Sequence, residues 1–331
     1  MVWLQFIISA GLVLVAGTCL TKFADRLSDA LGLGKVWIGV VLLGFVTSLP
    51  EAGSSLVSVI MLRAGDLAVG NMAGSNNFNL LLIVFLDFYY RKGAVTNAIP
   101  YNRAHGLSAL FAVTLAGIVV LEICLARVMV LPEIFGMSVG SVILAGWYFY
   151  GMRRIYQDSV SAGGETDLSD NAGPYTLAGM YARIAVSAFC VVLGSAFLAS
   201  AADVIAHMTG LGQTFVGSVF LAVATSLPEL VVTVSALRLG QADLAIGNIF
   251  GSNMINMFLL AVCDLFFRGK ALLQDVSTAH IFTLAVGFVM TFLVIAGLKQ
   301  DHKRTVLMMG WDSWAILATY ILGMLGLYLM T

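Results

Sequence analysis

The sequence predicts an all-α integral membrane protein with about ten transmembrane helices, arranged as two inverted five-helix repeats. The prediction rests on composition, on the spacing of apolar segments and on a repeated motif. Of the 331 residues, 60% are hydrophobic and only 11% are charged, whereas soluble proteins carry roughly 25% charged residues. The lipid bilayer is therefore the expected environment, and the net charge of −1 argues against a nucleic-acid partner.

Apolar segments long enough to cross a bilayer recur along the whole chain. A membrane-spanning helix needs about 20 predominantly apolar residues. The first segment lacks a basic start, so it is expected to be a retained helix and not a cleaved signal peptide. The predicted spans are residues 4–20, 36–61, 67–90, 107–123, 128–150, 178–200, 215–237, 244–267, 281–298 and 311–330.

Positively charged residues divide unevenly between the loops that these spans define. With ten spans, thirteen Lys and Arg residues fall on one side of the membrane and four on the other. Because Lys and Arg are enriched in cytoplasmic loops, the first side is expected to face the cytoplasm. Both termini are then expected to lie outside the cytoplasm.

An internal repeat determines the predicted architecture. Residues 32–51 match residues 210–229 at eleven of twenty positions, and residues 66–79 match residues 243–256 at nine of fourteen. Because each half holds five spans, an odd number, the second copy must enter the membrane upside down. The predicted domains are a first repeat at 1–157, a polar cytoplasmic loop at 158–174 and a second inverted repeat at 175–331. Inverted repeats place substrate sites near the bilayer midplane, on interrupted helices.

Each repeat places one glutamate, Glu51 or Glu229, in the middle of an apolar segment with the sequence TSLPE. A charge at that depth costs at least about 2.5–3.5 kcal/mol. The preceding proline removes one helical hydrogen bond and frees a carbonyl oxygen, while a Thr and a Ser lie within one turn. Carboxylate, hydroxyl and carbonyl oxygens are hard ligands, suited to Na⁺ or Ca²⁺. The four hydroxyl residues are Thr47, Ser48, Thr225 and Ser226.

The next span of each repeat carries a polar stripe at positions i, i+4 and i+8. A lone Asn or Ser in a membrane helix usually bonds a neighbouring helix, but two symmetric stripes beside two glutamates favour an ion site. Glycines next to the stripe are expected to let another helix approach closely. Asn76 and Asn253 lie off the stripe and receive no role. The stripes are Asn71, Ser75 and Asn79, and Asn248, Ser252 and Asn256; the glycines are Gly70, Gly74, Gly247 and Gly251.

Four other acidic residues are expected to have structural roles. Asp66 and Asp243 begin their spans and are expected to be helix N-caps. Asp87 and Asp264 each precede an arginine by four residues, a spacing that favours a salt bridge at a helix end.

Residues 136–140 spell GMSVG, the G-x-S-x-G pattern of serine hydrolases. In a membrane helix such a string usually serves packing, and none of the four histidines lies at a matching position. The chain is therefore expected not to be an enzyme, with an intramembrane serine protease as the alternative. The four cysteines lack the paired spacing of a metal site or a disulfide framework.

TSLPE followed by GN-x-x-GS-N-x-x-N, present once in each repeat, resembles the cation/calcium exchanger superfamily, and most of all its sodium/calcium exchanger branch. The motif regions cover residues 32–93 and 210–270. In that family the two glutamates bind Ca²⁺ and share Na⁺ sites with neighbouring Thr, Ser and Asn residues. The resemblance implies an ion site made of Glu51, Glu229, Thr47, Thr225, Ser48, Ser226, Ser75, Ser252, Asn79 and Asn256.

The resemblance implies a secondary antiporter that exchanges Ca²⁺ for Na⁺ by alternating access, with no cofactor besides the transported ions. Some family members carry Asp where this chain has Asn79 or Asn256, so the pocket here holds a charge of −2 and the ion stoichiometry stays open. The alternative is a Ca²⁺/H⁺ antiporter that uses the same pair of glutamates. Six hydroxyl groups around two carboxylates favour Na⁺, because a proton needs only a titratable group.

Overall fold

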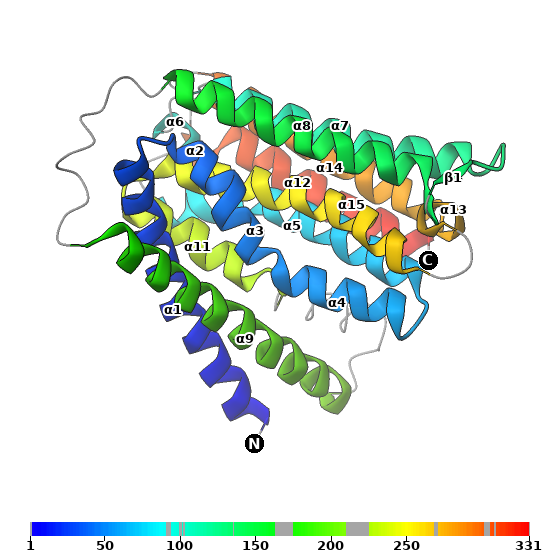
Figure 1. The fold of residues 1–331 in the computed structure, drawn as a ribbon, viewed down its shortest axis with the longest axis horizontal. Coiled ribbons are helices and arrows are strands. Elements are labelled where there is room, and N and C mark those ends of the chain that lie inside the picture. Colours follow the sequence, from blue (N-terminus) through cyan, green and yellow to red (C-terminus); the bar gives the residue numbers. More distant parts are fainter. Residues whose placement is uncertain are drawn as a thin grey trace. The chain divides into compact units, whose positions relative to one another are not determined.

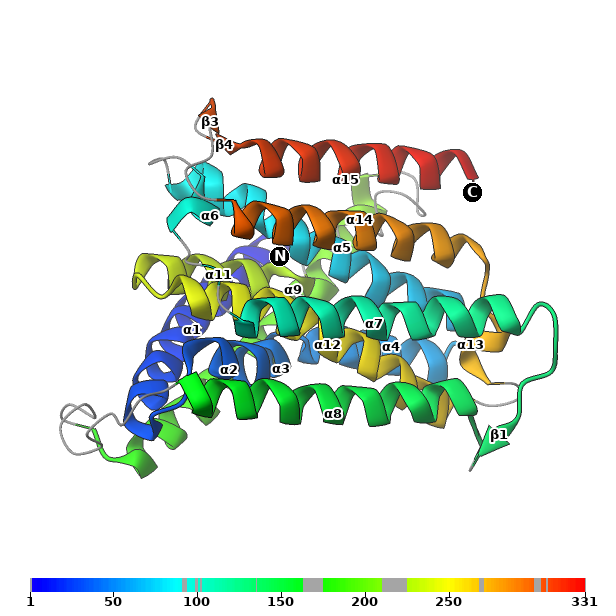
Figure 2. The ribbon, with the colours of Figure 1, turned by 90° about the horizontal axis from the view of Figure 1, so that it is seen from above.

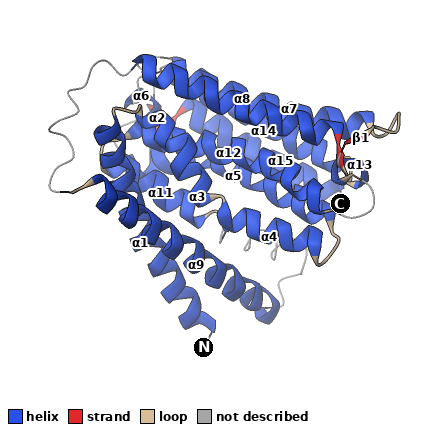
Figure 3. Cartoon of the chain, viewed as in Figure 1, coloured by secondary structure: helices blue, strands red, loops and turns tan. Residues whose placement is uncertain are grey.

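Almost all of the described chain is helical (Figure 3). The only strands among the described residues form two short antiparallel hairpins, β1 (Glu133–Ile134) with β2 (Met137–Ser138) and β3 (Thr305–Val306) with β4 (Met309–Gly310). The all-α prediction is confirmed. The computed structural model describes residues 2–90, 94–98, 101, 103–134, 136–162, 175–209, 225–267, 271–300, 305–307 and 309–330.

The order of elements in the first half recurs in the second. Each half has a long helix, a helix that begins at the TSLPE motif, a second long helix, a four-residue helix, a third long helix, a hairpin and a last helix. The first half contains α1 (Val2–Leu31), α2 (Lys35–Ile38), the π-helical η1 (Gly39–Leu43), α3 (Gly44–Thr47), α4 (Leu49–Ile60), α5 (Gly65–Tyr90), α6 (Val95–Ala98), α7 (Arg103–Leu125) and α8 (Val139–Ala162). The second contains α9 (Leu177–Thr209), α11 (Leu227–Arg238), α12 (Ala242–Phe266), α13 (Leu272–Asp275), α14 (Ala279–Lys299) and α15 (Trp311–Met330).

Seven of the described helices are long and apolar enough to cross a membrane. The segments Lys35–Thr47 and Leu49–Ile60 form an eighth span if they are counted together, with a bend of 45° between them. Helix α8 has 24 residues, but its aromatic and arginine-containing second half lowers its hydropathy. Residues 215–224 of another predicted span lie outside the described residues. The count of ten spans therefore stays a prediction.

The predicted span at residues 128–150 has the wrong boundaries. Val128 and Val130 are 83% and 94% exposed, and the β1–β2 hairpin follows them. Pro132 cannot continue a helix, and Gly136 turns the hairpin with a φ of +78°, which glycine adopts readily. Helix α8 starts only after this hairpin and continues to Ala162, so it also covers the first residues of the predicted loop at 158–174.

The chain forms two compact units, one of residues 1–50 and 157–252 and the other of residues 51–156 and 253–331. In the first unit α1 packs along α9 (Figure 1). The Gln5 amide donates to the Phe197 carbonyl oxygen at 3.2 Å, and the Phe23 ring meets the Tyr175 ring edge-on at 5.6 Å. The start of α1 thus lies against the end of α9, so the two helices are antiparallel. Because α1 and α9 are equivalent in the two halves, this is the direction that inverted repeats require.

In the second unit the third long helix of each half packs antiparallel to the last helix of that half. Helix α14 lies beside α15 (Figure 2), where Gly297 faces Asp312 and Gly323 faces Val286. In the same way Gly151 of α8 faces Phe111 of α7. Fully buried leucines and isoleucines of α5 and α7 form the core of this unit: Leu80, Leu82, Ile83, Leu86, Leu115 and Ile123.

Asp87 and Asp264 hold backbone segments in place. Both are fully buried. Asp87 accepts backbone N–H bonds from Val95 at 2.6 Å and Gly310 at 2.9 Å. Asp264 accepts them from Leu272 at 2.5 Å and Ser138 at 2.8 Å. Each aspartate therefore joins the short helix of its own half to the hairpin of the other half.

The arginines of the predicted salt bridges, Arg91 and Arg268, lie outside the described residues, so these salt bridges stay a prediction. The N-cap prediction for Asp66 and Asp243 is wrong, because both lie inside the first turn of their helices. Asp66 instead accepts the Ser277 backbone N–H at 2.7 Å and lies 2.9 Å from His280 Nε2.

Ser138, the serine of the G-x-S-x-G string, lies in strand β2 and not in a helix. Its side chain is fully buried, and its Oγ accepts the Ser141 backbone N–H at 3.0 Å. This is the bond of a helix N-cap, and it starts α8. The hydroxyl therefore has a structural role at the end of the hairpin.

The aspartate bonds predict an effect on stability. Replacing Asp264 by Asn is expected to lower the melting temperature of the purified protein, because the amide NH₂ then faces a backbone N–H. An unsatisfied buried donor costs about 1–3 kcal/mol. The control is Asp275→Asn, at an exposed position on α13, which should leave the melting temperature unchanged. Equal melting temperatures for the two variants would contradict the assigned role.

Candidate ion-binding site

All ten predicted site residues are buried, with at most 1% of any of them exposed. The boundary between the two units falls between Pro50 and Glu51 and again between Ser252 and Asn253. One glutamate therefore belongs to each unit. The first unit holds Thr47, Ser48, Thr225, Ser226, Glu229 and Ser252; the second holds Glu51, Ser75, Asn79 and Asn256.

In the first unit, a break in the helix positions two hydroxyls. Helix α3 ends at Thr47, the next residue Ser48 has a non-helical φ of −82° and ψ of 1°, and α4 begins at Leu49. Thr47 Oγ1 lies 3.1 Å from Ser252 Oγ, so hydroxyls from the two motifs meet. Ser48 Oγ is buried and has no hydrogen-bond partner among the described residues. It is therefore available to bind a cation.

Two glycines of α12 allow this contact, as the sequence predicts. A Cβ atom at Gly251 would lie 2.4 Å from the Val40 carbonyl oxygen, and one at Gly247 would lie 2.6 Å from the Val36 carbonyl oxygen. Contacts this short do not occur, so only glycine fits at either position. Gly70 and Gly74 are the equivalent glycines of α5, and the segment equivalent to α2–α3, residues 210–224, lies outside the described residues.

Both glutamates lie in the first turn of a 12-residue helix, Glu51 in α4 and Glu229 in α11. The unpaired backbone N–H groups of a first turn carry partial positive charge, which stabilises a nearby carboxylate. The proline before each glutamate fits this position because a first-turn N–H needs no helical partner. The TSLPE sequence therefore both breaks the membrane helix and creates an electrostatic environment for an acid.

Asn71 and Asn248, the first residues of the two polar stripes, donate hydrogen bonds to the helices that carry the glutamates. Asn71 Nδ2 donates to Ser55 Oγ at 3.0 Å and, more weakly, to the Glu51 carbonyl oxygen at 3.4 Å. Asn248 Nδ2 donates to Thr233 Oγ1 at 2.9 Å and to the Glu229 carbonyl oxygen at 3.4 Å. The matching distances indicate that the two motifs build the same local geometry. Both asparagines are positioning residues for the glutamate turns.

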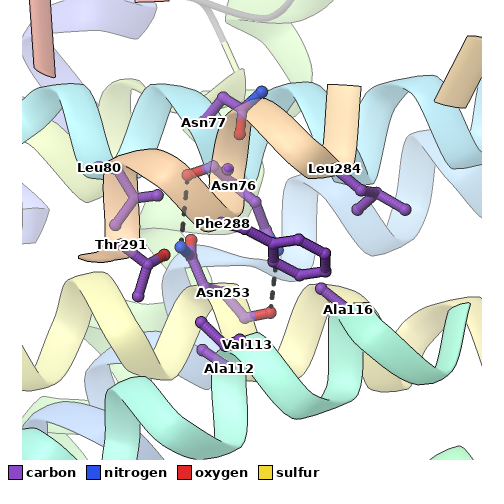
Figure 4. A pocket seen from close by; sticks show the side chains of 11 residues that line it. Asn76, Asn77, Leu80, Ala112, Val113, Ala116, Asn253, Leu284, Phe288 and Thr291 are labelled. Atoms are coloured by element: carbon purple, nitrogen blue, oxygen red, sulfur yellow. Dashed lines mark hydrogen bonds between the residues drawn. The ribbon is translucent and has the colours of Figure 1, made fainter. Parts of the chain in front are cut away.

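Asn76 and Asn253, which the sequence left without a role, bind each other in the second unit (Figure 4). Asn76 Nδ2 donates to the Asn253 carbonyl oxygen at 3.2 Å, and Asn253 Nδ2 donates to the Asn76 carbonyl oxygen at 3.3 Å. The reciprocal pair joins α5 to α12 with local two-fold symmetry. The sequence signal that could have identified them is their occurrence at equivalent positions of both repeats.

This reciprocal pair also fixes the last residue of each stripe. Asn79 Nδ2 donates to Asn253 Oδ1, and Asn256 Nδ2 donates to Asn76 Oδ1, both at 3.0 Å. The amide nitrogens are thereby occupied. The buried oxygens Asn79 Oδ1 and Asn256 Oδ1 have no hydrogen-bond partner among the described residues. Two acceptor oxygens are thus oriented for a cation.

A small cavity adjoins the reciprocal asparagine pair. It has about 20 Å³ of room for the centre of a water molecule, which is enough for one water. Asn76, Asn77, Asn253 and Thr291 give its wall a polar part, and the rest is apolar (Figure 4). Asn77 Nδ2 donates to the Thr283 carbonyl oxygen at 3.0 Å. The asparagine pair can therefore be hydrated from this side.

Comparison with known proteins finds one family across most of the chain. A family described as "Sodium/calcium exchanger protein" matches residues 1–154 and 180–329. The sodium/calcium exchanger MaX1 of Methanosarcina acetivorans is 28% identical over 329 residues, with 91% of this chain and 93% of that protein covered. The inner membrane protein YrbG of Escherichia coli is 28% identical over 262 residues, with 75% and 77% covered.

The solved structures give the same picture for the fold. A structure of the sodium-calcium exchanger NCX_Mj, soaked with Na⁺ and Sr²⁺, superposes with a TM-score of 0.73 at 21% identity. The superposition covers 98% of this chain and 99% of the other. At this level of identity the similarity shows a shared membrane-protein fold.

Proposed function

The chain belongs to the sodium/calcium exchanger protein family, and from this premise we propose that it exchanges Ca²⁺ for Na⁺ by alternating access. One observation carries the proposal. Each motif sets a buried glutamate in the first turn of a helix, together with buried hydroxyl and amide oxygens. The chain acts as a transporter and not as an enzyme, and Ca²⁺ and Na⁺ are its substrates.

The ten residues of the site supply the oxygens that these ions require. Ca²⁺ takes six to eight oxygen ligands, and the two carboxylates neutralise one Ca²⁺. After Ca²⁺ leaves, the same carboxylates bind Na⁺ with the hydroxyls and the amide oxygens of Asn79 and Asn256. Because either ion excludes the other from these oxygens, the two fluxes are coupled. The charge of −2 suits one Ca²⁺ or two Na⁺ without a net charge in the pocket.

The counter-ion decides between this proposal and a Ca²⁺/H⁺ antiporter. In sealed proteoliposomes, ⁴⁵Ca²⁺ uptake is expected to follow an outward Na⁺ gradient and to ignore a pH gradient of the same size. The physical reason is the set of six hydroxyl residues, because Na⁺ must exchange its water for several neutral oxygens. Uptake that follows the pH gradient and ignores Na⁺ would replace Na⁺ by H⁺ in the proposal.

A matched substitution tests the role of the hydroxyls directly. Thr47→Val and Thr225→Val are expected to raise the Na⁺ concentration needed for half-maximal exchange more than they raise that for Ca²⁺. Thr319→Val is the control, because the Thr319 hydroxyl bonds the Ala315 carbonyl of its own helix at 2.8 Å. Equal shifts for both ions would count against a shared Na⁺ site.

The proposed topology has two repeats, residues 1–157 and 175–331, that enter the membrane in opposite directions. The loop at 158–174 then faces the cytoplasm, and both termini face the other side. The uneven division of Lys and Arg between the loops supports this arrangement. A reporter fused after Thr331 is expected to read outside, and one inserted at Gly164 should read cytoplasmic. The reverse result at either position would contradict the ten-span topology.

A further inference from the structure

Basic side chains gather around two aromatic rings where the end of α1 packs against the start of α9. The Arg26 guanidinium carbon lies 4.6 Å from the centre of the Tyr175 ring, and that of Arg183 lies 5.0 Å from the same centre. Arg183 also lies 5.3 Å from the centre of the Phe23 ring. Arg26 first, and then Arg183 and Lys22, lower the pKa of the Tyr175 hydroxyl. The positive charges of Lys22, Arg26 and Arg183 therefore all act on the Tyr175 hydroxyl.

No acidic group among the described residues neutralises this basic cluster, which we define as Lys22, Arg26 and Arg183. The acids next to it in α1, Asp25 and Asp29, both bind Lys35 Nζ at 2.6 Å. Arg26 Nη1 is buried and lacks a hydrogen-bond partner within the described part of the chain. Guanidinium groups held near each other without a counter-charge attract an anion.

The basic cluster lies at the end of a surface that faces lipid. The exposed apolar residues of α1 recur every three or four positions, and Lys22 and Arg26 continue the same helical stripe. From Trp3 to Thr21 the helix rises about 27 Å, close to the roughly 30 Å of a hydrocarbon core. The basic cluster is then at the depth of the lipid headgroups. The exposed residues of the stripe are Trp3, Leu4, Ile7, Ile8, Leu14 and Val15.

Helix α9 presents the same type of surface from the other side of the cluster. Tyr181, Val186, Phe189 and Phe197 are exposed, and the first of these lies within one turn of Arg183. Because α1 and α9 are antiparallel, both lipid-facing surfaces reach the cluster at the same end. An acyl chain lying along these helices would therefore have its headgroup at the three basic residues.

We propose that Lys22, Arg26 and Arg183 bind the phosphate of an anionic phospholipid. A guanidinium can bind two phosphate oxygens at once, and stacking on Tyr175 and Phe23 orders both arginines before the lipid arrives. The lipid-exposed apolar stripes favour a phospholipid over a soluble phosphate ion. By the charge rule for loops this end faces the cytoplasm, where anionic lipids attract basic residues.

Spin-labelled lipids test the proposal on the full-length protein in phosphatidylcholine vesicles. The wild type is expected to immobilise labelled phosphatidylglycerol in preference to labelled phosphatidylcholine. The double variant Arg26→Gln/Arg183→Gln should lose this preference, by on the order of 5-fold per guanidinium removed. Arg153→Gln is the matched control, because it removes an exposed arginine of α8 that is predicted to lie on the same side. A double variant that keeps the wild-type preference would overturn the proposal.

Three further arms separate the alternatives. Arg26→Lys/Arg183→Lys keeps the charge and loses the paired hydrogen bonds, so an intermediate preference is expected; wild-type preference would overturn the guanidinium role. Displacement of the labelled lipid by millimolar inorganic phosphate would assign the cluster to a soluble anion. Replacing Glu165, Asp167 and Asp170 of the polar loop at 158–174 by their amides tests whether acidic residues of the chain itself bind the basic cluster. A preference that appears only in that variant would show that those acids occupy the cluster. Retained ⁴⁵Ca²⁺ exchange confirms that each variant is folded.

Discussion

Replacing either Glu51 or Glu229 by Gln is expected to abolish Ca²⁺ transport while the protein still inserts and folds. The substitution keeps the size of the side chain but removes one of two charges that neutralise a dehydrated divalent ion. Removing one partner of a buried ion pair costs about 3–5 kcal/mol, which corresponds to at least about 100-fold in affinity. The measurement is ⁴⁵Ca²⁺ uptake into proteoliposomes under an outward Na⁺ gradient, at several Ca²⁺ concentrations.

The control for this experiment is Glu133→Gln, in the exposed hairpin strand β1. It makes the same chemical change away from the motifs and should transport at the wild-type rate. Gel filtration and thermal unfolding of the glutamine variants separate lost binding from lost folding. A wild-type uptake rate in folded Glu51→Gln or Glu229→Gln would refute the role of that residue and with it the proposed ion site.

Hydropathy and the internal repeat were sufficient to predict the fold class, but not every boundary. The span at 128–150 was placed too early because Val128, Met129 and Val130 are as apolar as a membrane helix. The structure exposes them in a turn before the hairpin. A sliding apolar window cannot distinguish such a turn from a helix when Pro132 and Gly136 are weighed less than the valines around them. The break within the TSLPE span was predicted because proline has a local and specific effect.

The acidic residues show what local sequence rules leave out. At Asp87 and Asp264 the spacing rule considers only the arginine four positions further along the helix. Each of these aspartates also binds one backbone N–H that lies more than a hundred residues away. Asp66 was read as a cap of its own helix, but it bonds the start of α14. Such partners follow from tertiary packing, which a spacing rule within one helix cannot contain.

The two asparagines that were missed have a different explanation. Asn76 and Asn253 follow the stripe residues Ser75 and Ser252 by one position, and one position turns a helical side chain by about 100°. They therefore lie off the stripe, and the periodicity argument excluded them. Their role becomes visible only when α5 and α12 are seen in contact, because each binds the backbone of the other helix. The repeat itself, two asparagines at equivalent positions, was the better guide.

Gly251→Ala is the substitution of a single methyl group from which we expect the largest loss of stability and transport. Gly251→Ala adds one methyl group, which would lie 2.4 Å from the Val40 carbonyl oxygen and 2.5 Å from Val40 Cα. These are backbone atoms, which cannot turn aside as a flexible side chain can, so α12 and the π-helical segment η1 must separate. Overpacking of this kind costs about 1–3 kcal/mol or more. Thr47 ends α3, the four-residue helix that follows η1, so its hydroxyl is expected to move away from Ser252 Oγ.

Gly251→Ala is therefore expected to lower both the melting temperature and the rate of Na⁺-driven ⁴⁵Ca²⁺ uptake. The control is Gly11→Ala in α1, where a Cβ atom meets nothing within 4 Å. Because alanine is a better helix former than glycine by about 1 kcal/mol, Gly11→Ala should be neutral or slightly stabilising. If Gly251→Ala melts and transports like Gly11→Ala, the close approach of α12 to residues 36–44 does not hold the hydroxyl pair in place. A lower melting temperature with unchanged transport would limit the role of that contact to stability.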